Sequence, residues 1–310
     1  SDKMKAQELG LIDKKTGAGS KDLMKRAASV TLGKKLLVPV ALGIGAVQYL
    51  KGKVKKKEEK NKKTLKDFRE RKKPGFPSEK TKMIIINSPN NPSGSIYNEK
   101  ELYEIASVIK KYPNVFVLSD EIYEHINYGT KHVSFASIEG MYDRTVTVNG
   151  IAKAFAMTGW RIGYLGAPIW IAKACTKLQG QVTSGANCIA QRATIDAITE
   201  SPEKINYMVK EFEQRRNLII KLLSEIKGFQ LNNPDGAFYI FPDISYYFGK
   251  TIGDVTIKNA SDFAMLVLEK AHVATVTGDA FGSPKNIRIS YAASNENIIK
   301  AVNRIKDLLH

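Results

Sequence analysis

The sequence predicts an α/β protein, with a mostly parallel sheet flanked by helices followed by a smaller C-terminal α+β domain. Two observations lead to this prediction. From Met83 onward short apolar runs alternate with longer amphipathic stretches, and loops rich in Pro, Gly and Asn follow several of the runs. Strands that are separated by helices favour a parallel sheet, which binds ligands at the carboxyl ends of its strands.

The elements expected from these patterns fall into two groups. The first part should contain four strands, at residues 83–87, 115–118, 145–148 and 161–167. Its helices are expected over residues 98–110, 171–181, 190–199 and 202–226, the first of them capped by Asn98. The C-terminal part should contain strands at 238–241, 273–276 and 287–291 and helices at 260–269 and 296–309.

The net charge of +17 is concentrated at the start of the 310-residue chain. Residues 1–78 contain 22 Lys and Arg against 8 Asp and Glu, and the remaining residues contain 26 against 23. A nearly neutral remainder is typical of a metabolic enzyme and argues against a basic nucleic-acid-binding domain. The Lys-rich run at 51–73 is interpreted as a solvated helix or linker, with attraction to anionic lipid or RNA as the alternative.

An uncharged, mostly apolar run of 15 residues occupies Leu36 to Leu50. As a helix it would be about 22 Å long, which is short for a hydrocarbon core of about 30 Å. A membrane anchor or interfacial helix is one interpretation of this run. We favour the other, a segment buried against protein. A domain boundary is expected at Pro74–Pro77.

The chain contains only two cysteines, Cys175 and Cys188. Neither their spacing nor their neighbours suggest a metal site or a disulfide framework. A reducing compartment is therefore expected, and we predict a cytoplasmic protein.

The segment TVTVNGIAKAFAMTGWRIGYLG, residues 145–166, contains the clearest chemical signal. Lys153 lies there among apolar and small residues, where desolvation favours the free amine that a Schiff-base lysine needs. A lone lysine in such a loop is more often a side chain that extends its ammonium to water. Three further motifs decide between these interpretations.

The segment NGIAKAFAMTGWRIGY resembles the lysine motif of fold-type I pyridoxal-phosphate (PLP) enzymes, most closely the class I aminotransferases of the aspartate aminotransferase type. The resemblance implies that Lys153 forms the Schiff base with the cofactor and that Arg161 binds its phosphate. It also implies that Asp120, in VFVLSDEIYE, keeps the cofactor ring nitrogen protonated. Tyr123 would then hydrogen-bond the cofactor's phenolic oxygen.

Two more residues match substrate-binding positions of that family. Asn91, in SPNNPSG after an apolar strand, matches the asparagine that contacts both the phenolic oxygen and the substrate carboxylate. Arg288, in NIRISYA after GDAFG, matches the arginine that binds the α-carboxylate, a task suited to its planar fork of donors.

The resemblance covers residues 79–310, and residues 1–78 do not resemble the family's longer N-terminal part. It implies an incomplete fold-type I large domain over 79–228 and a small domain over 229–310. The expected function is PLP-dependent transfer of an amino group between an amino acid and a 2-oxo acid by a homodimer, with aspartate as a candidate donor and no metal. The alternative is a non-catalytic remnant acting as an interaction or membrane-tethered module.

Overall fold

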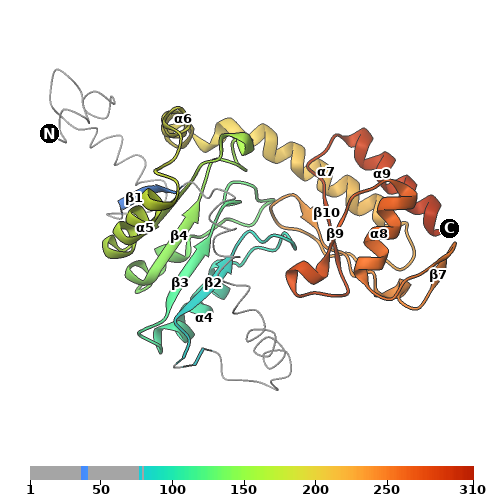
Figure 1. The fold of residues 1–310 in the computed structure, drawn as a ribbon, viewed down its shortest axis with the longest axis horizontal. Coiled ribbons are helices and arrows are strands. Elements are labelled where there is room, and N and C mark those ends of the chain that lie inside the picture. The colour runs from blue at the N-terminus through green and yellow to red at the C-terminus, as the bar shows by residue number, and fades with distance from the viewer. Residues whose placement is uncertain (1–35, 41–76, 79) are drawn as a thin grey trace. The chain divides into compact units, whose positions relative to one another are not determined.

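A computed structural model describes residues 36–40, 77–78 and 80–310. The charge run at 51–73 and residues 41–50 of the apolar run lie outside them. The chain divides into two compact units (Figure 1). Unit 1 comprises the described residues up to Ile86 with Leu102–Asp120 and Ser134–Ser201, and unit 2 comprises Asn87–Glu101, Glu121–Val133 and Pro202–His310. The domain boundaries at 78 and 228 stay a prediction.

Unit 1 is built on a five-stranded sheet with the strand order β1-β5-β4-β3-β2. Its strands are β1 (Leu36–Val40), β2 (Met83–Asn87), β3 (Phe116–Asp120), β4 (Thr145–Asn149) and β5 (Gly163–Ala167). Strands β3 and β4 are parallel, as predicted. Strand β5 is antiparallel to β4, because the loop between them contains no crossover helix that would return the chain to the same end.

The first five residues of the apolar run form strand β1. Residues Leu36–Val40 pair antiparallel with β5, in the register Leu36↔Ala167 to Val40↔Gly163. For these five residues the structure supports the interpretation that the segment packs against protein, and it contradicts the interpretation as a membrane or interfacial helix. In the described part of the chain, none of the helices has both the length and the apolarity needed to cross a bilayer.

Three helices accompany the sheet: α4 (Glu99–Lys110), α5 (Ile169–Val182) and α6 (Cys188–Thr199). The predicted cap of α4 is confirmed: the Glu101 backbone N–H donates to Asn98 Oδ1 at 3.0 Å, and the Asn98 N–H donates to Glu101 Oε2 at 2.8 Å. This reciprocal pair satisfies two backbone donors at the helix start. Helix α4 buries Leu102, Ala106 and Ile109, which lie on one face.

Arg144 fastens the end of α4 to the start of β3. It ends the short 3-10 helix η2 (Tyr142–Arg144), directly before β4. Its guanidinium donates to the carbonyl oxygens of Ile109 at 3.2 Å, of Val115 at 2.6 Å and of Tyr112. The last carbonyls of a helix have no partner within the helix, so this side chain supplies donors where the fold lacks them.

Unit 2 packs helices against a three-stranded antiparallel sheet in the order β6-β10-β9. The strands are β6 (Tyr239–Ile240), β9 (Val276–Thr277) and β10 (Ile287–Ser290), and a hairpin joins β7 (Thr251–Ile252) to β8 (Val255–Thr256). The helices are α7 (Asn206–Ser224), α8 (Ala260–Ala271) and α9 (Asn295–Leu309). They enclose a core that includes Leu223, Phe263 and Tyr291, each fully buried.

Two predicted elements of unit 2 were wrong in part. The strand expected over 273–276 is limited to Val276–Thr277, because His272 ends α8 in the left-handed region, with φ of 54°. The Val273 N–H then bonds back to the Val267 carbonyl at 3.2 Å instead of joining a sheet. The helix expected from 202 begins as a 3-10 turn, η4 (Pro202–Ile205), before α7. The β7–β8 hairpin was not predicted.

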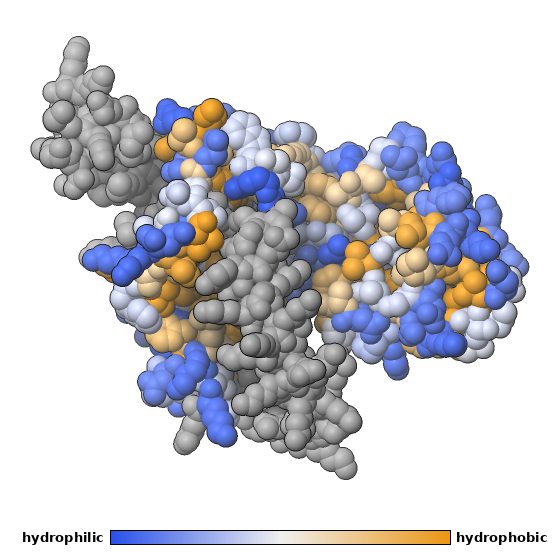
Figure 2. Space-filling model, viewed as in Figure 1, coloured by the Kyte–Doolittle hydropathy of each residue, from blue (hydrophilic) through white to orange (hydrophobic). Residues whose placement is uncertain are grey.

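Both units expose apolar side chains among hydrophilic ones (Figure 2). In unit 1 the exposed residues include Trp170 and Leu178 on α5, Ile189 on α6 and Ile85 on β2, which ends the described sheet. The Trp170 ring also meets Phe116 edge to face, with centroids 5.7 Å apart. These side chains form candidate surfaces for contact with protein outside the described residues.

Candidate active site

Three of the predicted site residues lie at one edge of the unit 1 sheet. Asp120 is the last residue of β3 and is in register with Val148, next to the end of β4. Lys153 follows the end of β4 by four residues, and Arg161 precedes the start of β5 by two. Because β5 runs antiparallel to β4, with Asn149 opposite Tyr164, the start of β5 lies beside the end of β4. The topology therefore brings a carboxylate, an amine and a guanidinium to the same edge.

The loop that carries Lys153 is held by buried neighbours and by unusual backbone angles. Ile151 and Ala154 are buried on either side of the half-buried lysine, and Ile151 packs with Ile162 and Ala190. Ala156 and Arg161 both adopt the left-handed region, with φ of 53° and 54°. Non-glycine residues there are strained and persist only where the surroundings impose the conformation, which is frequent at functional sites.

Arg161 is exposed, and its Nη1 donates to the Thr158 carbonyl at 2.9 Å. The side chain therefore folds back onto the turn that precedes it, the 3-10 helix η3 (Thr158–Trp160). The left-handed backbone at Arg161 also explains why β5 begins at Gly163 and not at residue 161, where the sequence pattern predicted it.

Unit 2 brings together the two residues predicted to bind a substrate carboxylate. Arg288 Nη1 donates to Asn91 Oδ1 at 2.8 Å, although 197 positions separate the two residues in the chain. The guanidinium carbon lies 4.6 Å from the Tyr239 ring centroid and 5.2 Å from that of Phe281. Asn91 is held in turn by its backbone N–H, which donates to Asn87 Oδ1 at 2.8 Å. An arginine fixed by an amide and two ring faces is preorganised to bind a carboxylate.

Gly278 shows why the GDAFG motif precedes Arg288. A Cβ at this position would lie 2.1 Å from the Ser283 carbonyl oxygen and 2.4 Å from that of Asn286. Only glycine allows the two backbone segments to approach this closely. The motif forms the 3-10 helix η6 (Gly278–Phe281), which places Phe281 against Arg288.

Tyr123 is buried, and its hydroxyl lies 2.8 Å from the hydroxyl of Tyr239. The rings of Phe238 and Tyr239 meet its ring edge to face, with centroids 5.4 and 5.9 Å away. Tyr239 therefore contacts two predicted site residues, Tyr123 and Arg288. Sequence reasoning missed it, because an aromatic residue in the apolar run FYIF carries no signal beyond that of a core strand.

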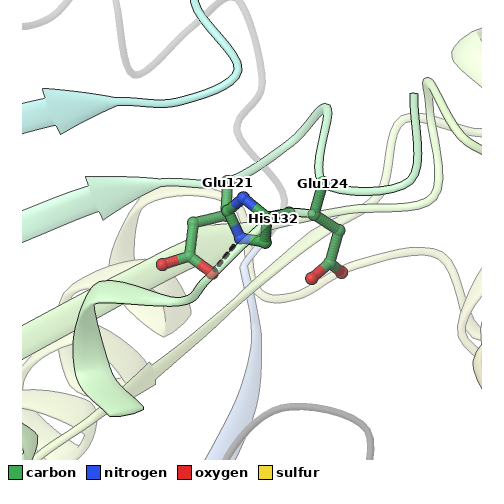
Figure 3. Close-up of side chains that lie close together, drawn as sticks. All are labelled: Glu121, Glu124 and His132. Carbon is green, nitrogen blue, oxygen red and sulfur yellow. Dashed lines mark hydrogen bonds and ion pairs between the residues drawn. The ribbon is translucent and has the colours of Figure 1, made fainter. Parts of the chain in front are cut away.

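A polar cluster follows Asp120 directly in the sequence (Figure 3). His132 Nε2 lies 3.2 Å from Glu121 Oε2, and these side chains are 11% and 1% exposed. Glu124 belongs to the same cluster, and His125 Nε2 lies 3.4 Å from Glu124 Oε1. Burial, together with the nearby His132, lowers the pKa of His125, which favours its neutral form. These residues were not predicted from the sequence.

The chemistry of these donors fits the predicted cofactor. An amine can form a Schiff base with an aldehyde, a guanidinium can bind a phosphate, and a carboxylate can hold a proton on a pyridine nitrogen. Lys153, Arg161 and Asp120 supply these groups at one sheet edge. In unit 2 the Asn91–Arg288 pair supplies donors for a carboxylate.

Comparison with known proteins identifies the family of the chain. The model of the family "Aminotransferase class I and II" matches residues 46–305, beginning inside the segment 1–78 for which no likeness was expected. A bifunctional aspartate aminotransferase and glutamate/aspartate-prephenate aminotransferase of Petunia hybrida is 48% identical over 237 residues, which are 75% of this chain and 50% of that protein. An aspartate aminotransferase of Pinus pinaster is 47% identical, with coverage of 75% and 48%.

The chain is also similar to a solved aminotransferase structure. The aspartate aminotransferase of Rhizobium meliloti superposes with a TM-score of 0.72 at 39% identity, over 75% of this chain and 59% of that one. The chain thus spans about half the length of the curated relatives it matches. The comparisons favour the predicted enzyme family over the non-catalytic alternative, and the chain belongs to the class I and II aminotransferases.

Proposed function

We propose that the chain acts in PLP-dependent transfer of an amino group between an amino acid and a 2-oxo acid. The placement of Asp120, Lys153 and Arg161 at one sheet edge carries this proposal. When bound, PLP supplies an electron sink for the carbanion formed at the substrate α-carbon. The chain's own residues have to bind, orient and move protons around it.

Each unit 1 residue has one task in this proposal. The Asp120 carboxylate keeps a proton on the ring nitrogen, since an adjacent negative charge favours the protonated ring. The Arg161 guanidinium binds the phosphate. The Lys153 amine would anchor the cofactor; once substrate had displaced it, the free amine would take the proton from the substrate α-carbon and deliver it to the cofactor carbon to which the lysine had been bound.

The unit 2 residues orient the ligands. Arg288 binds the substrate α-carboxylate with two parallel N–H···O bonds, and its bond to Asn91 fixes the plane of the guanidinium. The Asn91 side-chain amide donates to the carboxylate and to the cofactor's phenolic oxygen. Tyr123 donates its hydroxyl to the same oxygen while the Tyr239 hydroxyl holds it in place. The relatives' names make aspartate and glutamate the first donors to test, with prephenate as an acceptor.

We infer that two copies of the chain associate. The exposed apolar side chains Ile169, Trp170, Leu178 and Ile189 on α5 and α6 support this inference, because isolated proteins rarely expose several such residues on neighbouring elements. A cytoplasmic location stays a prediction.

The proposal is tested by cofactor labelling. The protein is incubated with PLP alone, its visible absorbance is recorded, and the complex is reduced with borohydride for peptide mass spectrometry. A panel of amino acids is added to a separate, unreduced sample, whose absorbance is recorded in the same way. We expect the reduced label on Lys153. Lys153→Ala should abolish the label and the absorbance, whereas Lys173→Ala, on the exposed side of α5, should change neither. Wild-type protein that stays colourless in excess PLP, or a label distributed over surface lysines, would overturn the proposal.

A further inference from the structure

The Glu121–His132 pair lies next to two predicted cofactor-binding residues in the chain (Figure 3). Glu121 directly follows Asp120 and precedes Tyr123 by two residues, and both neighbours are assigned to cofactor binding above. The backbone turns here, because the Glu124 N–H donates to the Glu121 carbonyl at 2.9 Å and the Ile126 N–H donates to the Tyr123 carbonyl at 2.8 Å. Any shift of the Glu121 backbone would therefore pass to both neighbours.

Burial makes the orientation of Glu121 costly to change. Its side chain is 1% exposed, and a carboxylate removed from water needs donors close to its oxygens. His132 provides one such donor from a segment eleven residues further along the chain. Removing one partner of a buried pair leaves a desolvated group without that bond, so the local backbone has to move or admit water.

We propose that Glu121 and His132 are positioning residues that set the orientation of Asp120 and Tyr123 toward the cofactor. The inference rests on the proposed function for the identity of the ligand. The ordering of residues 121–133 by this pair does not depend on it. His132 acts through Glu121 and does not itself touch the cofactor. Displacement of a catalytic group by about 1 Å can cost a hundredfold in rate, so a support of this kind is consequential.

The same side chains could instead hold a metal ion. Glu121, Glu124 and His132 each offer one ligand atom, and these atoms lie within 4.8 Å of one another. The Nε2–Oε2 separation of 3.2 Å is that of a hydrogen bond, and it needs a proton on the nitrogen that a metal would occupy. Metal binding is thus a distinct outcome that the experiment must separate.

The test compares His132→Phe, which removes the donor, with His132→Gln, which restores an amide donor. His125→Phe is the matched control, since it makes the same substitution on the same segment at a more exposed histidine. The first measurement is hydrogen exchange of residues 121–133 without cofactor. The second is PLP affinity. The third is the pH at which the bound cofactor's absorbance changes, which reports on the groups that contact the cofactor, Asp120 and Tyr123 among them, and not on general stability.

In His132→Phe we expect faster exchange confined to 121–133, PLP affinity about tenfold weaker, consistent with a lost hydrogen bond to a charged group, and a shifted absorbance midpoint. His132→Gln should recover most of each effect, and His125→Phe should stay within about twofold of wild type. If His132→Phe does not fold, Glu121→Gln makes the same comparison with a neutral, isosteric side chain.

Two results would overturn the proposal. One is wild-type affinity and wild-type absorbance midpoint in a folded His132→Phe protein. The other is one equivalent of zinc in purified wild-type protein that is lost in His132→Phe. Wild-type protein that binds no PLP refutes the proposed function, and the cofactor role of the pair with it. The exchange measurement then still decides whether the pair orders residues 121–133.

Discussion

Arg144→Ala should destabilise unit 1 by about 3 kcal/mol. The guanidinium donates to three backbone carbonyls, those of Ile109, Tyr112 and Val115, at the end of α4 and the start of β3. Hydrogen bonds to charged groups contribute about 1.5–3 kcal/mol each when buried. Arg144 is only partly buried, so in the variant water would satisfy part of the carbonyls' hydrogen bonding and reduce the loss. A cation near a helix carboxyl end adds about 0.3–1 kcal/mol to the stabilisation. Burial lowers the pKa of Arg144, but an arginine remains charged near neutral pH.

The assay for this prediction is urea unfolding with hydrogen exchange of residues 102–118. Arg144→Lys keeps the charge and loses the fork, so about half of the loss should remain. The control is Arg192→Ala on α6, whose exposed ion pair with Asp196, at 4.0 Å, should contribute less than about 0.5 kcal/mol. If Arg144→Ala and Arg192→Ala differ by less than about 1 kcal/mol, the carbonyl contacts do not stabilise the fold as argued.

Three further predictions concern unit 2. Arg288→Lys should lower kcat/KM for amino acids about 10- to 100-fold, because one charge-assisted bond and the planar fork are lost. The control is Arg304→Lys on α9. Equal kinetics in both variants would contradict the assignment. Gly278→Ala should destabilise the unit by about 1–3 kcal/mol through overpacking. The control, Gly180→Ala, lies in open space on α5 and should be neutral or stabilising by up to about 1 kcal/mol. The denaturation midpoints of the two variants, compared with that of the wild type, test this difference. Because the folded state lowers the pKa of His125, the unfolded state binds more protons below pH about 6.5. The free energy of unfolding should therefore fall as the pH drops through that value, and His125→Gln should make the fall shallower; an unchanged slope would contradict this.

The elements that the sequence predicted well are those with strong local signals. Helix α4 begins where Asn98 caps it, and β2, β3 and β4 begin within one residue of their predicted positions. Prediction failed where a contact distant in sequence decides the conformation. Strand β1 exists through its pairing with β5, and a mixed run of Leu, Val and Pro does not distinguish a strand from a helix.

The candidate site was predictable to the extent that its residues carry chemistry. Lys153 and Asp120 could be selected because each lies in a motif that resembles the family's and carries a group, an amine or a carboxylate, that the expected chemistry needs. Tyr239 and His132 could not, since each acts by contact with another residue, across 116 positions to Tyr123 and across 11 to Glu121. Supporting residues are defined by their neighbours in space, and a single sequence contains no record of those neighbours.

The Asn91–Arg288 hydrogen bond bears on function more strongly than either residue alone. A half-buried arginine in a strand could serve only packing, and NNPSG could serve only as a turn. The amide oxygen of Asn91 occupies one donor of the guanidinium, and the rings of Tyr239 and Phe281 cover its faces. A guanidinium has five N–H donors in one plane, so an arginine oriented in this way presents its other donors in a fixed direction. Selection for packing alone gives no reason to orient them, whereas recognition of a planar carboxylate requires it.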